Sequence, residues 1–162
     1  MRLDPLSFRR AAGLFATGVT VVTTRVEGVD HAMTANSFTS VSLDPLLVLV
    51  SVDKTARWHA AIAEANVFGV SVLAADQAAV SRLFATRGRP LDVREAGIGL
   101  IEGPETGVVL FDHALATFEC RVSDTHDAGD HTLVVGTVLA FHTPHPDASP
   151  LVFFRGEYRT LT

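Results

Sequence analysis

The sequence predicts an α+β fold that is mainly β, with an antiparallel sheet closed into a small barrel and a few helices inserted. Two observations carry this prediction. Short runs rich in β-branched residues, separated by turn residues, recur along the chain, and from Val108 onward nearly every apolar run is of this kind. No G-x-G-x-x-G sequence follows any predicted strand, so a Rossmann dinucleotide-binding domain has no support.

The first elements are a short helix and a hairpin. Asp4 and Pro5 suit the N-cap and first position of a helix, and Gly18 is the residue expected to end it. The β-branched run that follows predicts a strand, and Gly28 with its acidic neighbours predicts a turn. The expected hairpin therefore consists of strand 19–26, turn 27–30 and strand 31–34.

A polar stretch at 34–42 precedes an apolar run at 46–52, with Asp44-Pro45 between them. The apolar run predicts a buried strand. The hydroxyl and amide side chains before it both donate and accept hydrogen bonds, so they can form a ligand-binding loop on a rigid strand. The same residue types also crowd ordinary turns, and from the residues alone both interpretations stay open.

The middle of the chain predicts two helices, at 55–65 and 76–86, with an apolar strand at 67–73 between them. The segment 91–107, with several glycines and mixed charge, predicts a loop or mobile cover with little regular structure. The remaining chain predicts strands at 108–111, 114–122, 132–142 and 151–154, and a short one near Tyr158. Cys120 lies within one of them and is expected to be a buried small hydrophobic residue, not a nucleophile.

Composition excludes several classes of function. The 162 residues predict a single domain, 1–162, and the net charge of −5 gives no support to nucleic-acid binding. No apolar run reaches the roughly 20 residues of a membrane helix, and the N-terminal residues lack the apolar core of a signal peptide. A single cysteine fits a reducing, cytoplasmic location. His142 and His145 have no third ligand nearby, so no metal site is expected.

Two further places are candidates for chemistry. Residues 51–55 pass from a strand end to a helix start, where backbone N–H groups attract phosphates, although plain helix capping explains them equally. Gly129-Asp130-His131 precedes a predicted strand, where a histidine can hold a ligand or move a proton. The alternative for that segment is an ordinary hairpin turn in which Asp130 orients a surface histidine.

Several blocks of this sequence, taken in order, resemble the short-chain flavin reductase family, the reductase components of two-component flavin-dependent monooxygenases. The first blocks are Phe15-Ala16-Thr17-Gly18-Val19-Thr20-Val21-Val22 and Met33-Thr34-Ala35-Asn36-Ser37-Phe38-Thr39-Ser40-Val41-Ser42-Leu43-Asp44-Pro45. The later ones are 49–53, His59, Ser81-Arg82-x-Phe84-Ala85, 114–116, 119–120, Gly129-Asp130-His131 and 150–158. The resemblance covers nearly the whole chain.

This resemblance implies a split β-barrel that binds FMN or FAD, as a homodimer with the flavin near the subunit interface. It also implies NAD(P)H:flavin oxidoreductase activity, in which a hydride passes from C4 of the nicotinamide to N5 of the flavin. The reduced flavin then leaves for a partner monooxygenase. In such a reaction the protein supplies binding, orientation and electrostatics.

Matched residue by residue, the resemblance implies a flavin site and a nicotinamide site. The flavin site consists of Thr34, Ala35, Asn36, Ser37, Ser51, Val52, Asp53, Lys54, Thr55, Ser81 and Arg82, with the last seven toward the ribityl and phosphate end. The nicotinamide site consists of His131, Phe154, Gly156 and Tyr158. His131 is the candidate catalytic residue, although hydride transfer itself needs no general acid.

Three points stay open at the level of sequence. Ala32 stands where the family often has glycine, which would alter the approach to the flavin ring. The segment 91–107 matches nothing, which leaves FMN against FAD, and NADH against NADPH, undecided. The sequence shows no arginine cluster for a 2′-phosphate, and this favours NADH. A flavin-binding carrier without enzymatic activity, and a purely structural homodimer, are the competing hypotheses.

Overall fold

The computed structural model describes residues 2–89 and 92–161 of the chain. It has three α-helices, α1 (Pro5–Ala12), α2 (Arg57–Ala65) and α3 (Ala78–Ala85), and two 3-10 turns, η1 (Ala75–Gln77) and η2 (Val93–Ala96). The strands are β1 (Thr17–Gly18), β2 (Thr20–Val26), β3 (Val29–Ala35), β4 (Thr39–Leu43), β5 (Leu46–Asp53), β6 (Val67–Val72), β7 (Leu100–Glu102), β8 (Val109–Phe111), β9 (Ala116–Ala128), β10 (His131–His142), β11 (Val152–Phe154) and β12 (Glu157–Arg159).

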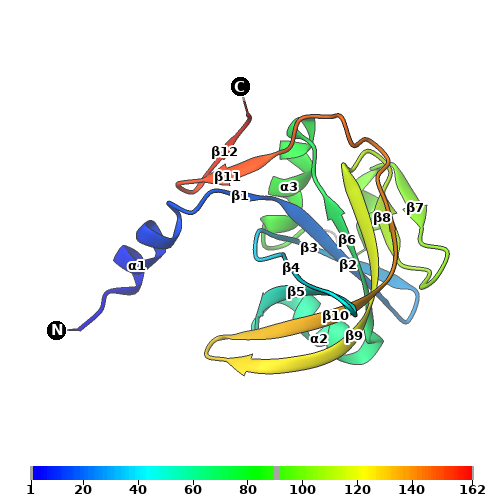
Figure 1. Ribbon diagram of the computed structural model, residues 1–162, viewed down its shortest axis with the longest axis horizontal. Helices are drawn as coiled ribbons and strands as arrows, with labels where there is room; N and C mark the ends of the chain where they lie inside the picture. The colour runs from blue at the N-terminus through cyan, green and yellow to red at the C-terminus, as the bar shows by residue number, and fades with distance from the viewer. Residues whose placement is uncertain (1, 90–91, 162) are drawn as a thin grey trace.

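Seven strands form one curved sheet in the order β3-β2-β6-β9-β10-β5-β4, with every neighbouring pair antiparallel (Figure 1). Two smaller sheets, β1-β11-β12 and β7-β8, complete the β structure of the described residues. This arrangement confirms the expected α+β class with a mainly antiparallel sheet, and it agrees with a split barrel. No helix among the described residues is long and apolar enough to cross a membrane.

The core divides into two clusters of buried apolar side chains. One is built around Val50, Trp58 and Phe68, and the other around Leu73, Phe84 and Phe111. Cys120 belongs to the first cluster, is fully buried, and burial with nearby Glu119 raises the pKa of its thiol to about 12. The expectation that Cys120 is a packing residue is therefore confirmed, because a thiol held protonated is a poor nucleophile.

The N-terminal helix starts as predicted and ends earlier. The Asp4 carboxylate accepts hydrogen bonds from the backbone N–H groups of Leu6 and Ser7, at 3.3 and 2.9 Å. The helix ends at Gly13 and not at Gly18, because Thr17 and Gly18 pair with β11 as strand β1. Helix α1 projects away from the sheet (Figure 1) and buries none of its residues within the described part of the chain.

Two expected loops turn out to be shorter than the sequence suggested. Residues 39–43, placed in the polar loop, form β4, because the edge of β5 offers unpaired backbone groups that Thr39 and its neighbours pair with. Within 91–107, where Leu91 lies outside the described residues, η2 and β7 are ordered. Buried Asp30 holds this segment, since its carboxylate pairs with Arg25 at 2.7 Å and with Arg94 at 2.6 Å.

The other predicted elements are confirmed within a few residues. The exception is β9, which continues to Ala128, whereas the sequence predicted a strand that ends at residue 122. Strands β9 and β10 together form a long two-stranded ribbon. Its turn is Gly129-Asp130, and Gly129 adopts a φ of +66°, a conformation that favours glycine. His131 is thus the first residue of β10, opposite Asp53 of β5.

Candidate functional site

Two adjoining clefts lie where the end of β3 meets α3, the start of α2 and the C-terminal hairpin. The first, which we name the arginine cleft, measures about 570 Å³ and is lined by Arg9, Met33, Thr34, Asp53, Thr55, Ala56, Arg57, Phe84, Ala85, Arg87, Gly88 and Arg89. The second, the tyrosine cleft, measures about 300 Å³ and is lined by Arg9, Val19, Thr34, Asn36, Ala85, Phe153 and Tyr158. Arg9, Thr34 and Ala85 line both, so the two clefts form one continuous surface.

A chain of hydrogen bonds builds the wall between the two clefts. The Thr34 hydroxyl donates to the Ser81 carbonyl at 2.6 Å, and the Ser81 hydroxyl lies 2.5 Å from the Tyr158 hydroxyl. Ser81 is fully buried, so its side chain joins α3 to β12 and is not free to bind a ligand. The Tyr158 ring packs 5.8 Å from Phe153, with the Arg82 guanidinium 5.0 Å from its centroid.

The residues that follow Thr34 divide by role. Asn36 is exposed and lines the tyrosine cleft, whereas the Ala35 side chain is buried in the core. The Ser37 hydroxyl donates to the Ser51 carbonyl at 2.8 Å and accepts from the Ser51 N–H at 3.2 Å. Ser37 and Ser51 therefore fix the short loop 36–38 to β5, which makes Asn36 the side chain of this group that is available to a ligand.

The residues at the end of β5 also differ in whether their side chains face the clefts. Val52 is fully buried in the core, so its side chain does not face the clefts. Asp53 and Thr55 line the arginine cleft, and the Asp53 carboxylate accepts from both the N–H and the hydroxyl of Thr55, at 2.8 Å each. The Thr55 N–H keeps the pKa of Asp53 below its ordinary value. The Lys54 ammonium pairs with Asp127 on the ribbon, and Lys54 lines neither cleft.

Three arginines that the sequence interpretation passed over converge on the arginine cleft. Arg57 begins α2, and Arg87 and Arg89 flank Gly88 in the loop after α3. The Arg57 guanidinium donates to the Arg89 carbonyl at 3.2 Å, across 32 positions of sequence. Nothing in the sequence pattern indicates that Arg57 lies beside Arg87 and Arg89.

The predicted nicotinamide residues are not all brought together. His131 lies at the end of the ribbon beside Asp130, with its Nδ1 2.7 Å from the Asp130 carboxylate, and it lines neither cleft. Phe154 stacks with Arg155, and Gly156 lies in the hairpin turn between β11 and β12 with a φ of +75°. Of this group, Tyr158 alone lines either of the two clefts, beside Phe153, which was not predicted. Gly156 lines a separate pocket of about 430 Å³ between the N-terminal helix and the C-terminal hairpin.

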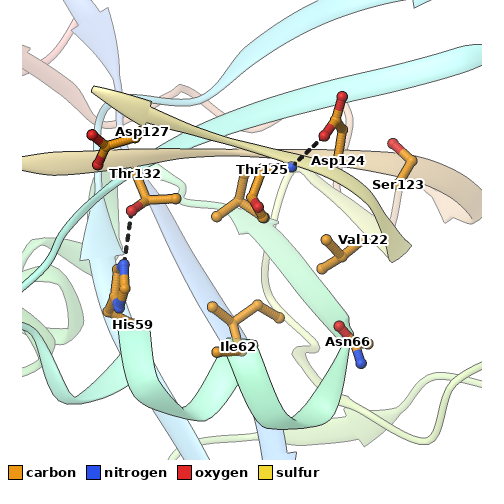
Figure 2. Close-up of a pocket in the computed structure, with 11 residues that line it drawn as sticks. His59, Ile62, Asn66, Val122, Ser123, Asp124, Thr125, Asp127 and Thr132 are labelled. Carbon is orange, nitrogen blue, oxygen red and sulfur yellow. Dashed lines mark hydrogen bonds between the residues drawn. The ribbon is translucent and has the colours of Figure 1, made fainter.

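A further cavity of about 550 Å³ lies between α2 and the ribbon. Figure 2 shows His59 and Ile62 of α2 facing the ribbon, and Asn66 at the end of that helix, with His59 Nε2 2.8 Å from the Thr132 hydroxyl. None of the predicted site residues lines this cavity. It is therefore distinct from the two clefts described above.

His31, half-buried on β3 near the arginine cleft, is expected to make stability depend on pH. Burial, and then the charge of Arg57, lower the pKa of its imidazole below the ordinary 6.5, and these outweigh the opposing charges of Asp92 and Asp30. A histidine with a lowered folded-state pKa binds protons more readily when unfolded, so stability falls as the pH drops below about 6.5.

Urea unfolding of the parent and of His31→Gln at several pH values between about 8 and 5 tests this expectation. The variant should lose less stability on acidification than the parent does. His142→Gln, at an exposed position on β10, serves as the control. Equal pH dependence in the parent and in His31→Gln would remove His31 as its source.

Comparison with known proteins identifies this architecture. The family model described as the flavin reductase like domain matches residues 12–162. The FMN reductase (NADH) SmoA of Agrobacterium fabrum is 46% identical over 152 residues, which span 94% of this chain and 83% of that protein. Among solved structures, BorF, the flavin reductase component of a bacterial two-component tryptophan halogenase, has a TM-score of 0.92 and 48% identity, over 98% of each chain.

A second solved structure is the NADH:FAD oxidoreductase SgcE6 of Streptomyces globisporus, in complex with NAD and FAD fragments. It has a TM-score of 0.91 and 37% identity, and the match covers 100% of this chain and 97% of that one. The family model spans more than nine-tenths of the chain. The chain therefore belongs to the flavin reductase family.

Proposed function

We propose that this chain is an NAD(P)H-dependent flavin reductase that reduces FMN or FAD, with NADH as the preferred donor. The observation that carries the proposal is the continuous cleft, with an aromatic wall of Phe153 and Tyr158 at one end and arginines at the other. A planar ring system with a phosphate tail is the ligand that such a surface complements. SmoA, which is named as an FMN reductase that uses NADH, supports the same donor.

The described residues fit a flavin. Asn36 and Thr34 supply polar groups at the middle of the cleft, and Asp53 and Thr55 border its basic end. A bound flavin would supply the electron-accepting ring, and the part of this chain is to bind it, orient it and exclude water. We propose that Tyr158 lies beside the nicotinamide. A role for His131 remains a prediction, since its side chain lies outside both clefts.

The partner and the assembly are further parts of the proposal. We infer that the reduced flavin is delivered to a flavin-dependent monooxygenase, and BorF, with a halogenase as partner, is a relative working in such a two-component system. We also infer that residues 1–162 form one domain of a homodimer. The N-terminal segment supports the dimer, because Leu6 and Phe8 of α1 and Phe15 just after it are 64%, 73% and 79% exposed, which suits a surface covered by a second copy.

The test is NADH or NADPH oxidation followed at 340 nm in air, with FMN, FAD or no flavin added. We expect oxidation that depends on added flavin and is faster with NADH than with NADPH. Absence of oxidation in all combinations, together with flavin binding measured by fluorescence quenching, would favour the carrier function instead. Absence of both oxidation and binding would reject a flavin-based function altogether.

A further inference from the structure

The cavity between α2 and the ribbon, which we name the ribbon cavity, lies apart from the two clefts. It measures about 550 Å³, a size typical of sites for small organic molecules. Its lining consists of His59, Ile62, Ala63, Asn66, Val122, Ser123, Asp124, Thr125, Asp127, Thr132 and Val134. Ile62 and Val134 are 4% and 1% exposed and belong to the core cluster built around Trp58, so the floor of the cavity is the packed core itself.

Hydrogen bonds join the two walls of the ribbon cavity at both of its ends. At one end His59 Nε2 lies 2.8 Å from the Thr132 hydroxyl, as Figure 2 shows. At the other end the Val122 N–H donates to the Asn66 carbonyl at 2.8 Å. Helix and ribbon are therefore held together at two points and stay apart between them. Because the cavity is formed in advance, a ligand does not have to order its walls.

The two acids in the lining are not available to a ligand inside the ribbon cavity. Asp127 lies opposite Thr132 in the ribbon and shares its face toward α2, but its carboxylate already pairs with Lys54. Asp124 lies opposite Val135, and its carboxylate points away from α2 (Figure 2). A charged ligand would lose its hydration without gaining an unpaired opposite charge from these described residues. The lining therefore favours an uncharged molecule.

Polar groups that can bind such a molecule lie at the two ends of the apolar floor. His59 and Thr132 form one end, and the side-chain amide of Asn66, which both donates and accepts, lies at the other. His59 and Asn66 are seven positions apart, roughly 10 Å along the axis of α2. A phenol that carries a second hydroxyl group on a short side chain has about this length, and its ring suits the apolar floor between the ends.

We propose that the ribbon cavity is a second ligand site, which binds a small uncharged phenol or aryl alcohol with a hydroxyl group at each end. One hydroxyl bonds to the pair formed by His59 and Thr132, the other bonds to the Asn66 amide, and the ring packs on Ile62 and Val134. The residues that line this cavity line neither cleft, so its ligand and a flavin can be bound together. The site is independent of the reductase function proposed above.

The test uses tyrosol, a phenol with a hydroxyethyl group para to its hydroxyl, as the probe. The signal is the fluorescence of Trp58, the one tryptophan of the chain, which is buried in α2 beside His59. We expect tyrosol to change this fluorescence in a saturable way. The dissociation constants of para-ethylphenol and phenethyl alcohol, each of which lacks one hydroxyl group, should be about 3- to 10-fold higher, the size of one lost hydrogen bond.

Three variants locate the probe. Ala63→Leu fills the cavity from α2, whereas Ala60→Leu adds the same side chain at an exposed position of α2 outside the lining, and serves as the matched control. Asn66→Gly removes the amide at a position whose φ of +60° glycine accepts. We expect tyrosol binding to weaken at least about 10-fold in Ala63→Leu, to weaken about 3- to 10-fold in Asn66→Gly, and to stay unchanged in Ala60→Leu. Circular dichroism and an unfolding curve establish that each variant is folded.

Several outcomes would overturn the proposal. Tyrosol binding that Ala63→Leu leaves unchanged, or that FMN displaces when binding is measured by calorimetry, would place the probe in the two clefts. Absence of binding by both fluorescence and calorimetry would show that the cavity takes no ligand of this class. A change of oligomeric state in Ala63→Leu and not in Ala60→Leu would show that protein covers the cavity. In contrast, a parent that binds tyrosol as expected and does not oxidise NADH or NADPH would keep this site and reject the reductase alone.

Discussion

Replacing Glu119 with alanine is expected to lower the free energy of unfolding by about 3 kcal/mol, because it removes one buried acceptor shared by three donors of a neighbouring turn. Glu119 lies in β9 and is fully buried. Its Oε1 accepts from the N–H groups of Glu105 and Thr106, at 3.0 and 2.8 Å, and from the Thr106 hydroxyl at 2.8 Å. These bonds hold the turn 103–107 that joins β7 to β8.

The surroundings of Glu119 leave little room for compensation. A side chain at Gly103 would overlap the Glu119 carboxylate, so the turn and the carboxylate are packed directly against each other. Urea unfolding at constant pH gives the free energy, and Glu105→Ala, which removes an exposed side chain and keeps the same N–H, is the matched control. A loss below about 1 kcal/mol in Glu119→Ala would mean that water replaces the carboxylate at this turn.

The second large effect is expected at Tyr158, where alanine should reduce kcat/KM for NADH about 10- to 100-fold. The Tyr158 ring packs against Phe153 and beneath Arg82, and its hydroxyl is bonded to Ser81. Removing the ring opens one wall of the tyrosine cleft. Two rings that exchange a hydride must be held in contact, so the loss of a wall should lower the rate more than it lowers the affinity for FMN.

Tyr158→Phe is the matched control for this prediction. It keeps the ring and its contacts with Phe153 and Arg82 and removes only the hydrogen bond to Ser81, so most of kcat/KM for NADH should remain. Circular dichroism and an unfolding curve establish that both variants are folded. An unchanged kcat/KM in Tyr158→Ala would exclude Tyr158 from the nicotinamide site, and a loss that matches the loss in FMN affinity would assign Tyr158 to the flavin.

Local sequence was sufficient for most of the elements. Strands β2 and β11 are runs of β-branched and aromatic residues, and this pattern acts over a few residues whatever the rest of the chain does. Asp4 and Pro5 also predicted the start of a helix from local sequence alone. The Asp4 side chain accepts hydrogen bonds only from residues two and three positions further along the chain. The fold class and the family followed from these elements and from the order of the matching blocks.

Predictions failed where the partner of a segment is distant. Residues 39–43 are a strand because β5 presents an unpaired edge, and Gly18 is in a strand because β11 lies beside it. The segment after residue 91 is ordered through Arg94, which pairs with Asp30 more than 60 positions earlier. Each of these contacts joins residues far apart in the chain, and no local pattern records which of them will meet.

The sequence by itself determined most of the elements, the antiparallel fold class, the family and the presence of Thr34, Asn36, Asp53, Thr55 and Tyr158 among the candidate residues. Only the tertiary structure decided which of the candidates share a cleft. It buried Ala35, Val52 and Ser81, turned Lys54 toward Asp127, and brought Arg57 beside Arg89. The physical reason is that burial and proximity of side chains depend on how the sheet curves and where the helices pack, which is set by contacts between distant segments.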